Sequence, residues 1–394
     1  VLGGYGNIAS GIQSIVLGGG VRGDYGSGVA NYGNAASGNF AVALGGGGYN
    51  NGTGATGSHS LVGPGQDIGA NGPKSVILNG YHAAAKKAYS VVGSGIYNFA
   101  CGYQAVVMSG TCNTTCGKQT FIGSGYKNKI YGSEAAGCGS AIVGGDLNTI
   151  TTNAKRSFIG GGHDNTVNQN YSFIGSGADN IVSGCHSVVV GGDNNKALSG
   201  CNFIGSGKSN EITNTSRESV IVGGSLNKAL SSCSFIGGGF TNTVGGSASV
   251  VVGGMSNNMP AGGQADAAFI GGGQHNYVCS RHSVIVGGKS NQIVDKCGFI
   301  GGGKSNLVYQ QGSAVVGGCN NKSCGSYSTI IGGRSNEVYR GHTNSFIGGT
   351  GILSVSSNMF HTNRLFLSAG ALPTSDPGVT GVVWRDGTDL KISV

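Results

Sequence analysis

The sequence predicts an all-β fold, a parallel β-solenoid with coils of about 15 residues. Three observations predict it. Glycine contributes 81 of the 394 residues, while charged residues make up only 10%. A short apolar word followed by glycine recurs along most of the chain with a period of 15 residues. An asparagine follows each word at a constant distance, which marks a repeated turn of the backbone.

The composition excludes several other classes of protein. Collagen requires a three-residue period with much proline, and this chain has five prolines. Disorder is disfavoured because apolar residues recur at constant positions and the net charge is a modest +8. No apolar run approaches the roughly 20 residues of a membrane-spanning helix, so we expect no membrane insertion. The first residues, VLGGYGN, form the middle of a word, and we expect the native start to lie upstream.

The period is clearest in the second half of the chain. A word begins one residue before each apolar triplet, at Ser157, Ser172, Ser187, Asn202, Ser219, Ser234, Ser249, Ala268, Ser283, Gly298, Ser313, Ser328 and Ser345. Looser copies begin at Ser60, Ser75, Ser90, Ala105, Thr120 and Ser140. Most starts are 15 residues apart, with insertions of two, four or five residues between the others. Fifteen residues are too few for two packed helices but suffice for one coil of strand, corner, short strand and corner.

The asparagine lies eight residues after each start in sixteen consecutive words. These residues are Asn98, Asn113, Asn128, Asn148, Asn165, Asn180, Asn195, Asn210, Asn227, Asn242, Asn257, Asn276, Asn291, Asn306, Asn321 and Asn336. Asparagine tolerates the left-handed backbone region, so Gly-Gly-x-x-Asn predicts a corner with this residue in that conformation. Stacked coils would place the asparagines about 4.8 Å apart, close enough for their amides to form a ladder.

The apolar triplet occurs in two forms. Phe-x-Gly words alternate with Val-x-Val words, so the two outer positions of the triplet keep a nearly constant volume. We expect these residues to form a packing face between chains: Phe158, Phe173, Val188, Phe203, Val220, Phe235, Val250, Phe269, Val284, Phe299 and Phe346. The middle residue points into the coil. A thin coil buries only one face of this strand, so the other predicts a homo-oligomer.

The repeats divide the chain into two expected parts. Residues 1–349 form the β-roll, with an irregular insertion at about 21–39. Residues 350–394 contain Trp384 and the segment VVWRDGTDLKIS, in which Asp386-Gly387 suits the turn of a hairpin. An uncovered end coil exposes unpaired strand edges, so we interpret this second part as a cap.

The words SVVVGGDNNKALSG and SFIGGGFTNTVGGS resemble the head repeats of trimeric autotransporter adhesins. The resemblance covers about residues 1–350 and implies a left-handed β-roll that assembles as a homotrimer. The segment from Arg364 to Val394 instead resembles short C-terminal segments of phage and marine-virus fibre proteins. We therefore expect a structural fibre protein on the surface of a virus or phage particle, attached to other virion proteins and displaying host-attachment surfaces. An adhesin head on a bacterial surface is the alternative.

Apparent catalytic and metal motifs have simpler explanations. GFIGGGKS, Gly298 to Ser305, matches the phosphate-loop pattern, but it is an ordinary repeat word and no helix is predicted after it. The acidic residues lack the nine-residue period of calcium-binding rolls, and the eleven cysteines contain no C-x-x-C pair. We expect no enzyme activity, no cofactor, no metal site, and buried thiols. Cys201, Cys233 and Cys297 precede coil starts, where a small apolar residue would pack.

Lysines recur at two repeat positions. Lys208, Lys289 and Lys304 lie in the corner, and Lys196 and Lys228 follow the asparagine. These residues predict rows of positive charge along the solenoid. We expect such rows either to attract an acidic host glycan or envelope receptor, or to contribute to solubility alone. Aromatic residues do not alternate with basic ones, so we expect no nucleic-acid partner.

Overall fold

The computed structural model describes residues 1–4, 6–18, 33–45, 54–133, 138–262, 264–363, 372–380, 383–386 and 389–392. Within these ranges the chain consists of strands, turns and bends, without a helix. It divides into two compact units, Val1–Gly287 and Gly288–Val394. The division falls inside the repeats, and each unit is a parallel β-solenoid with coils of about 15 residues. The predicted fold class is thereby confirmed at this level, while its left-handedness stays a prediction.

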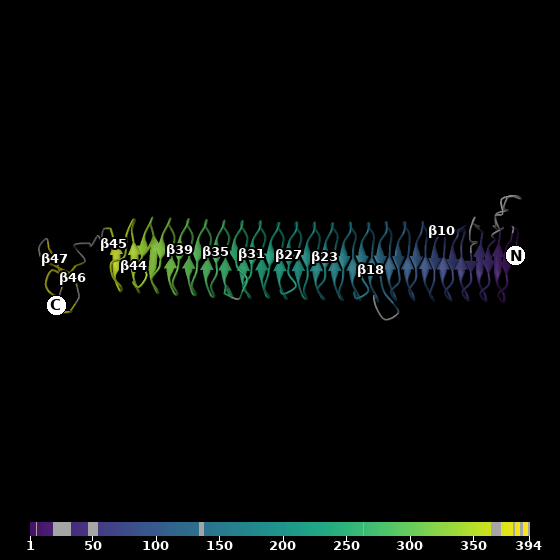
Figure 1. The fold of residues 1–394 in the computed structure, drawn as a ribbon, viewed down its shortest axis with the longest axis horizontal. Helices are drawn as coiled ribbons and strands as arrows, with labels where there is room; N and C mark the ends of the chain where they lie inside the picture. The colour runs from purple at the N-terminus through teal and green to yellow at the C-terminus, as the bar shows by residue number, and fades with distance from the viewer. Residues whose placement is uncertain are drawn as a thin grey trace. The chain divides into compact units, whose positions relative to one another are not determined.

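In the first unit each coil contributes one strand to each of two parallel sheets, here called sheet A and sheet B (Figure 1). Sheet A contains the strands that open the coils: β2 (Ile15–Leu17), β4 (Val42–Leu44), β6 (Leu61–Val62), β9 (Val76–Ile77), β12 (Val91–Val92), β14 (Val106–Val107), β16 (Phe121–Ile122), β18 (Ala141–Ile142), β20 (Phe158–Ile159), β22 (Phe173–Ile174), β24 (Val188–Val189), β26 (Phe203–Ile204), β28 (Val220–Ile221), β30 (Phe235–Ile236), β32 (Val250–Val251), β34 (Phe269–Ile270) and β36 (Val284–Ile285).

Sheet B contains the short strands that follow the asparagine position. Its strands in this unit are β1 (Ile8–Ala9), β3 (Ala35–Ala36), β5 (Gly54–Ala55), β8 (Gly69–Ala70), β11 (Ala84–Ala85), β13 (Phe99–Ala100), β15 (Thr114–Thr115), β17 (Lys129–Ile130), β19 (Thr149–Ile150), β21 (Thr166–Val167), β23 (Ile181–Val182), β25 (Lys196–Ala197), β27 (Glu211–Ile212), β29 (Lys228–Ala229), β31 (Thr243–Val244), β33 (Asn258–Met259) and β35 (Tyr277–Val278). A separate parallel pair, β7 (Gly65–Gln66) and β10 (Gly80–Tyr81), links two corners.

The second unit repeats this arrangement. Its sheet A strands are β38 (Phe299–Ile300), β40 (Ala314–Val315), β42 (Thr329–Gly332), β44 (Phe346–Gly348) and β45 (Phe360–Thr362), and its sheet B strands are β37 (Gln292–Ile293), β39 (Leu307–Val308), β41 (Lys322–Ser323) and β43 (Glu337–Val338). The parallel strands therefore continue beyond residue 349, because β45 pairs with β44. An antiparallel hairpin follows, formed by β46 (Val383–Asp386) and β47 (Asp389–Ile392). Its predicted role as a cap stays a prediction.

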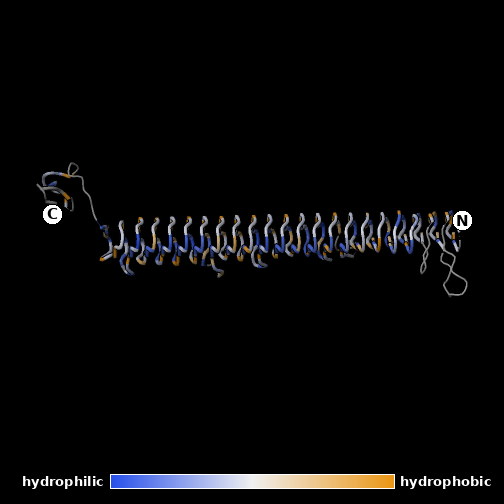
Figure 2. Tube along the Cα trace, turned by 90° about the horizontal axis from the view of Figure 1, so that it is seen from above, coloured by the Kyte–Doolittle hydropathy of each residue, from blue (hydrophilic) through white to orange (hydrophobic). Residues whose placement is uncertain are grey.

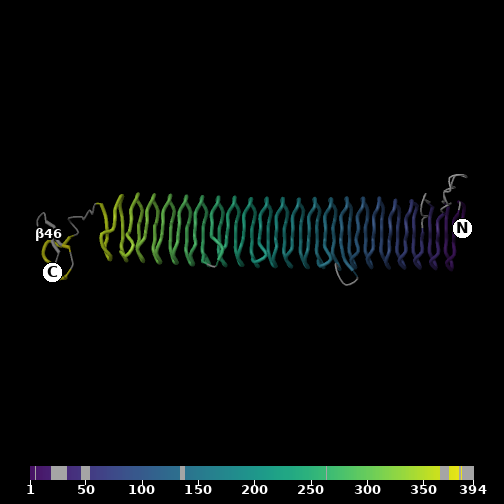
Figure 3. Tube along the Cα trace, in the orientation of Figure 1, coloured from purple at the N-terminus to yellow at the C-terminus, as the bar shows by residue number. Residues whose placement is uncertain are grey.

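Register is the same from coil to coil. Phe158 pairs with Phe173 in sheet A, and Thr166 pairs with Ile181 in sheet B. Because equal positions lie opposite each other, every insertion must leave the stack at a corner. The strands after the expected insertion obey this rule, since Ala35 pairs with Ile8. Residues 21–32 of that insertion lie outside the described residues. Figure 3 follows the chain through these repeated coils.

The core lies between the two sheets. In sheets A and B the second residue of the strand points inward, and Ile159 of sheet A and Val167 of sheet B are both fully buried. Burying an isoleucine or valine side chain contributes about 1.5–3 kcal/mol relative to leaving it exposed. Hydrophobic residues recur in the same places from coil to coil in Figure 2. The predicted inward position of the middle triplet residue is confirmed.

The asparagine corner differs from the prediction in one respect. None of the sixteen asparagines has a positive φ; the residue immediately before each usually does, for example Asp179 (φ 55°) before Asn180. A glycine two residues earlier, Gly177, is also left-handed (φ 103°). The prediction that the asparagine itself adopts the left-handed conformation is therefore wrong. The asparagine keeps an ordinary backbone conformation, and its contribution to the corner is the set of hydrogen bonds that its side-chain amide makes.

Candidate functional site

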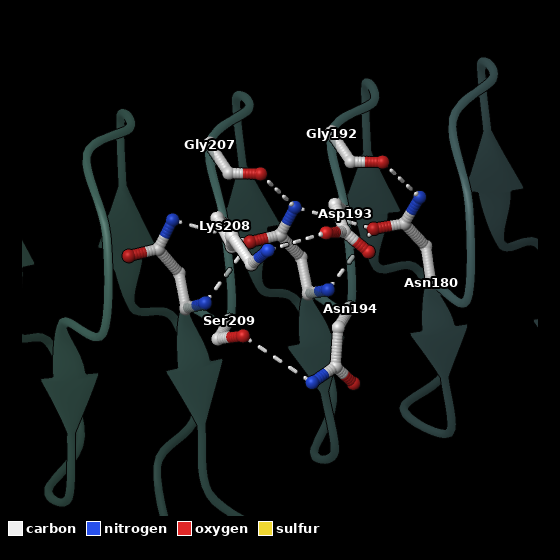
Figure 4. A network of polar contacts seen from close by, with 9 residues as sticks. Asn180, Gly192, Asp193, Asn194, Gly207, Lys208 and Ser209 are labelled. Atoms are coloured by element: carbon white, nitrogen blue, oxygen red, sulfur yellow. Dashed lines mark hydrogen bonds and ion pairs between the residues drawn. The ribbon is translucent and has the colours of Figure 1, made fainter.

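The asparagines form a buried hydrogen-bond ladder that runs from Asn98 to Asn276 in the first unit and from Asn291 to Asn336 in the second. The backbone N–H of Asn195 donates to Oδ1 of Asn180 in the preceding coil at 3.0 Å. The Nδ2 group of Asn180 donates to the carbonyl oxygen of Gly192 in the following coil at 2.9 Å (Figure 4). Because Gly192 and Asn195 lie in the same coil, the side chain of Asn180 joins its own coil to the next one by two hydrogen bonds. Because these amides are fully buried, losing one leaves polar groups without water.

Direct amide-to-amide bonds occur in only part of the ladder. Nδ2 of Asn195 donates to Oδ1 of Asn180 at 3.2 Å, and Nδ2 of Asn210 donates to Oδ1 of Asn195 at 3.1 Å. Elsewhere the chain of bonds passes through the backbone, as where the N–H of Asn257 donates to Oδ1 of Asn242 at 3.0 Å. The ladder therefore depends on the backbone as much as on neighbouring amides.

The glycine of each corner is needed for two reasons. Gly207 has a φ of 104°, which side chains rarely adopt. A Cβ there would also collide with the carbonyl oxygen of Gly224 in the next coil. The close approach of successive corners brings Nδ2 of Asn210 within 2.9 Å of that same oxygen. The absence of a side chain at the corner glycine therefore allows the close approach of coils on which the hydrogen bond of the asparagine depends.

A second buried ladder runs through the coil starts, and the sequence argument did not assign it. Oγ of Ser172 donates to the carbonyl oxygen of Gly184 in the following turn of the chain at 2.8 Å. The backbone N–H of Ser172 donates to Oγ of Ser157 in the preceding coil at 3.2 Å. Asn202 replaces serine in one coil, where its Oδ1 accepts from the N–H of Ser219 at 3.1 Å. The recurrence of serine at the coil starts is the feature of the sequence that could have predicted this ladder.

The outward face of sheet A is apolar in both units. In the Phe-x-Gly words the phenylalanine ring lies over the glycine that follows it by two residues. A Cβ added to Gly160, for example, would lie 3.4 Å from Cε1 of Phe158. In the alternate words a second valine fills this space, and Val190 and Val222 are each 47% exposed. Phe158 and Phe173 stack with ring centroids 5.3 Å apart. The face is therefore smooth, closely packed and open to solvent in a single chain.

The charged rows are less uniform than predicted. Nζ of Lys208 lies 3.2 Å from Oδ2 of Asp193, and Nζ of Lys228 lies 3.6 Å from Oε2 of Glu211 (Figure 4 shows the first pair). In the first unit the prediction of purely positive rows is thus wrong, because carboxylates of neighbouring coils alternate with the lysines. In the second unit a backbone bridge joins Lys289 and Lys304, and neither forms an ion pair with another described residue.

The cysteines also differ from the prediction. Cys201, Cys233 and Cys297 are exposed, with φ values of 60°, 57° and 58°. They are not packed thiols, because the left-handed corner before each coil start turns its side chain outward. The structure contains no disulfide among the described residues.

Two thiols do meet. Cys101 and Cys116 follow the paired strands β13 and β15. Hydrogen bonding from Cys116, aided by the charge of Lys86, lowers the pKa of Cys101 to about 7, although burial opposes this effect. The same hydrogen bond and burial raise the pKa of Cys116. Cys101 is therefore the thiol of this pair that ionises first.

We expect Cys101 to react with iodoacetamide with a rate midpoint near pH 7, because the thiolate is the nucleophile. Replacing Cys116 by alanine removes the hydrogen bond and should move the midpoint upward. Mass spectrometry of peptides labelled between pH 6 and 9 measures both. An unchanged midpoint in the Cys116→Ala variant contradicts the assignment.

Other candidate sites find no support in the described residues. Gly298 to Ser305 contains β38 followed by a corner, and no helix follows. No cluster of three or more metal-ligating side chains occurs in the ranges that the structure covers. Across those ranges no helix has the length and apolar character of a membrane span.

Comparison with protein-family models and with curated protein sequences finds no match for this chain.

Proposed function

We propose that this chain is a structural fibre protein of a virus or phage particle. It assembles as a homotrimer through the outward face of sheet A and displays host-attachment surfaces on its remaining faces. Its work is mechanical rather than catalytic: the stacked coils keep those surfaces at constant spacing. Its partners are two further copies of itself, neighbouring virion proteins and a receptor on the host surface.

One observation carries the proposal, the exposed apolar face of sheet A. Soluble monomers rarely expose contiguous apolar patches larger than a few hundred Å². Here most coils add a partly exposed phenylalanine or a pair of valines to the same face. Identical chains around a symmetry axis cover such a face without an exposed remainder. The resemblance to trimeric adhesin heads supports three chains rather than two.

Sedimentation equilibrium tests the assembly. We expect a species of three times the chain mass of 39.1 kDa, with no dissociation at micromolar concentration. A stable monomer contradicts the trimer, because the apolar face would then be exposed in solution.

The adhesin-head alternative is favoured by the repeat words themselves, and the gene distinguishes it from a fibre. Flanking genes for capsid and tail proteins support the viral role. A coding sequence that continues into a coiled coil and a membrane anchor supports the bacterial one and overturns the viral proposal.

A further inference from the structure

The asparagine ladder is interrupted in three successive coils of the first unit. Between Asn34 and Asn98 the equivalent positions hold Thr53, Ile68 and Ala83. Ile68 and Ala83 are buried, so apolar side chains replace the bonding amides. In these coils β7 and β10 pair as short strands at the corner. A local departure from an otherwise strict rule, with its cost in buried hydrogen bonds, is expected where function requires it.

A cavity of about 490 Å³ lies on sheet B at this interruption. Its floor consists of the outward residues of four successive strands, Ala35, Gly54, Gly69 and Ala84. The equivalent residue of the next coil is Phe99, whose ring closes one end. The volume falls within the range of about 300–1,000 Å³ that is typical of ligand pockets. The cavity is formed by one chain, on the sheet opposite the apolar face described above.

Aromatic and polar side chains form its walls. The rings of His82 and Tyr97 stack with centroids 4.9 Å apart and planes within 1° of parallel. Nε2 of His82 lies 3.3 Å from Oδ2 of Asp67, in the preceding coil. These three residues all have left-handed φ values between 50° and 56°, so the corner backbone holds them in one row.

The opposite edge is polar and neutral. Oγ1 of Thr56 donates to Oδ1 of Asn71 at 3.1 Å, and both residues are exposed. Among the described residues that line the cavity, Asp67 alone carries a carboxylate, and it pairs with His82. One cation borders it, since Nζ of Lys86 lies 5.6 Å from the centroid of the Phe99 ring. The described lining residues contain no cluster of cations that would hold a phosphate or a polyanion.

We propose that this cavity binds a neutral pyranose unit of a surface glycan. A pyranose ring has an apolar face of C–H groups, which packs against aromatic rings such as Tyr97 and Phe99. Its hydroxyl groups require neutral or paired donors and acceptors, which the Thr56–Asn71 edge and the His82–Asp67 pair provide. The flat floor of glycine and alanine allows the sugar to approach the backbone. This site extends the proposed display role by naming its ligand, but it does not depend on assembly.

Binding to printed glucose, galactose, mannose and N-acetylglucosamine oligosaccharides tests the proposal, with sialylated and sulfated probes as the anionic arm. We expect the full chain to bind at least one neutral probe. Ala84→Phe fills the floor, and Tyr97→Asn removes a wall while suiting the left-handed backbone; each should weaken binding at least ten-fold. Thr114→Phe, at the same repeat position two coils further on, is the matched control and should bind normally.

A second variant of the cavity floor, Gly54→Val, provides an independent test in case Ala84→Phe does not fold. A Cβ at Gly54 would lie 3.7 Å from Cγ2 of Thr56, an ordinary contact. Circular dichroism and thermal unfolding establish that each variant is folded. No neutral binding, binding of anionic probes alone, or undiminished binding by the folded floor variants would each overturn the proposal. Sedimentation of the same samples reports trimer assembly separately, so the two proposals fail independently.

Discussion

Replacing Asn257 by alanine is expected to destabilise its coils by about 1–3 kcal/mol, because a buried backbone N–H of the next coil loses its acceptor. Nδ2 of Asn257 donates to the carbonyl oxygens of Gly253 at 2.9 Å and Gly273 at 3.0 Å. Its Oδ1 accepts from the backbone N–H of Asn276 at 3.1 Å. Alanine leaves the buried N–H of Asn276 without its acceptor and removes a donor from the carbonyl oxygen of Gly253, while the oxygen of Gly273 still accepts from the N–H of Met255.

The adjacent residue is a close control. Asn258 is exposed on sheet B and pairs through its backbone with Tyr277, so Asn258→Ala should change stability by less than about 0.5 kcal/mol. Urea denaturation compares the two variants. Hydrogen exchange should show faster exchange around residues 242–285 only in Asn257→Ala, since repeats interact chiefly with their neighbours. Equal stability of both variants would contradict a structural role for the ladder.

The second large effect is expected at the outward face of sheet A. Glutamate at both Val190 and Val222 should dissociate the proposed trimer. Each valine is about half exposed in a single chain, so the fold should persist. In the trimer the carboxylates would be buried without partners, at a cost of several kcal/mol per chain. A cost of about 4 kcal/mol corresponds to a roughly thousand-fold weaker association.

The control places the same charges on sheet B. Thr166→Glu with Thr243→Glu alters the first residues of β21 and β31, which are only partly buried. This variant should remain trimeric. Sedimentation velocity distinguishes the species, and circular dichroism checks that the sheets are intact. A trimer that survives charges on sheet A would show that another surface joins the chains.

The repeat allowed much of the coil to be predicted. Ile159 and Val167 are buried and Phe158 faces outward because alternate residues of a strand point to opposite faces. Sequence spacing also placed Asn180 at the corner, but not its backbone conformation. Which residue turns left-handed depends on where the amide must point to reach Ser176, Gly192 and the preceding asparagine. Those partners belong to three coils and cannot be read from one word.

Side chains at corners were predicted less well than those in strands. Cys201 was expected to pack, yet its left-handed corner turns it outward. Lys208 was assigned to a positive row, but its neighbour in the stack is Asp193. The cavity on sheet B was also not foreseen, although Gly54, Gly69 and Ala84 share one repeat position. A row of small residues on a sheet forms a cavity only where larger side chains stand on both sides of it, as His82, Tyr97 and Asn71 do here.

The sequence by itself determined the period, the inward and outward alternation and the constant register, because each depends on local spacing and on close packing of identical words. Only the tertiary structure decided which polar groups meet across coils, which corner side chains face solvent and where sheet B is hollow. These features depend on residues 15 or more positions apart, which stacking brings within hydrogen-bond distance. Their geometry follows from the path of the corners, which the order of residues within a single coil does not specify.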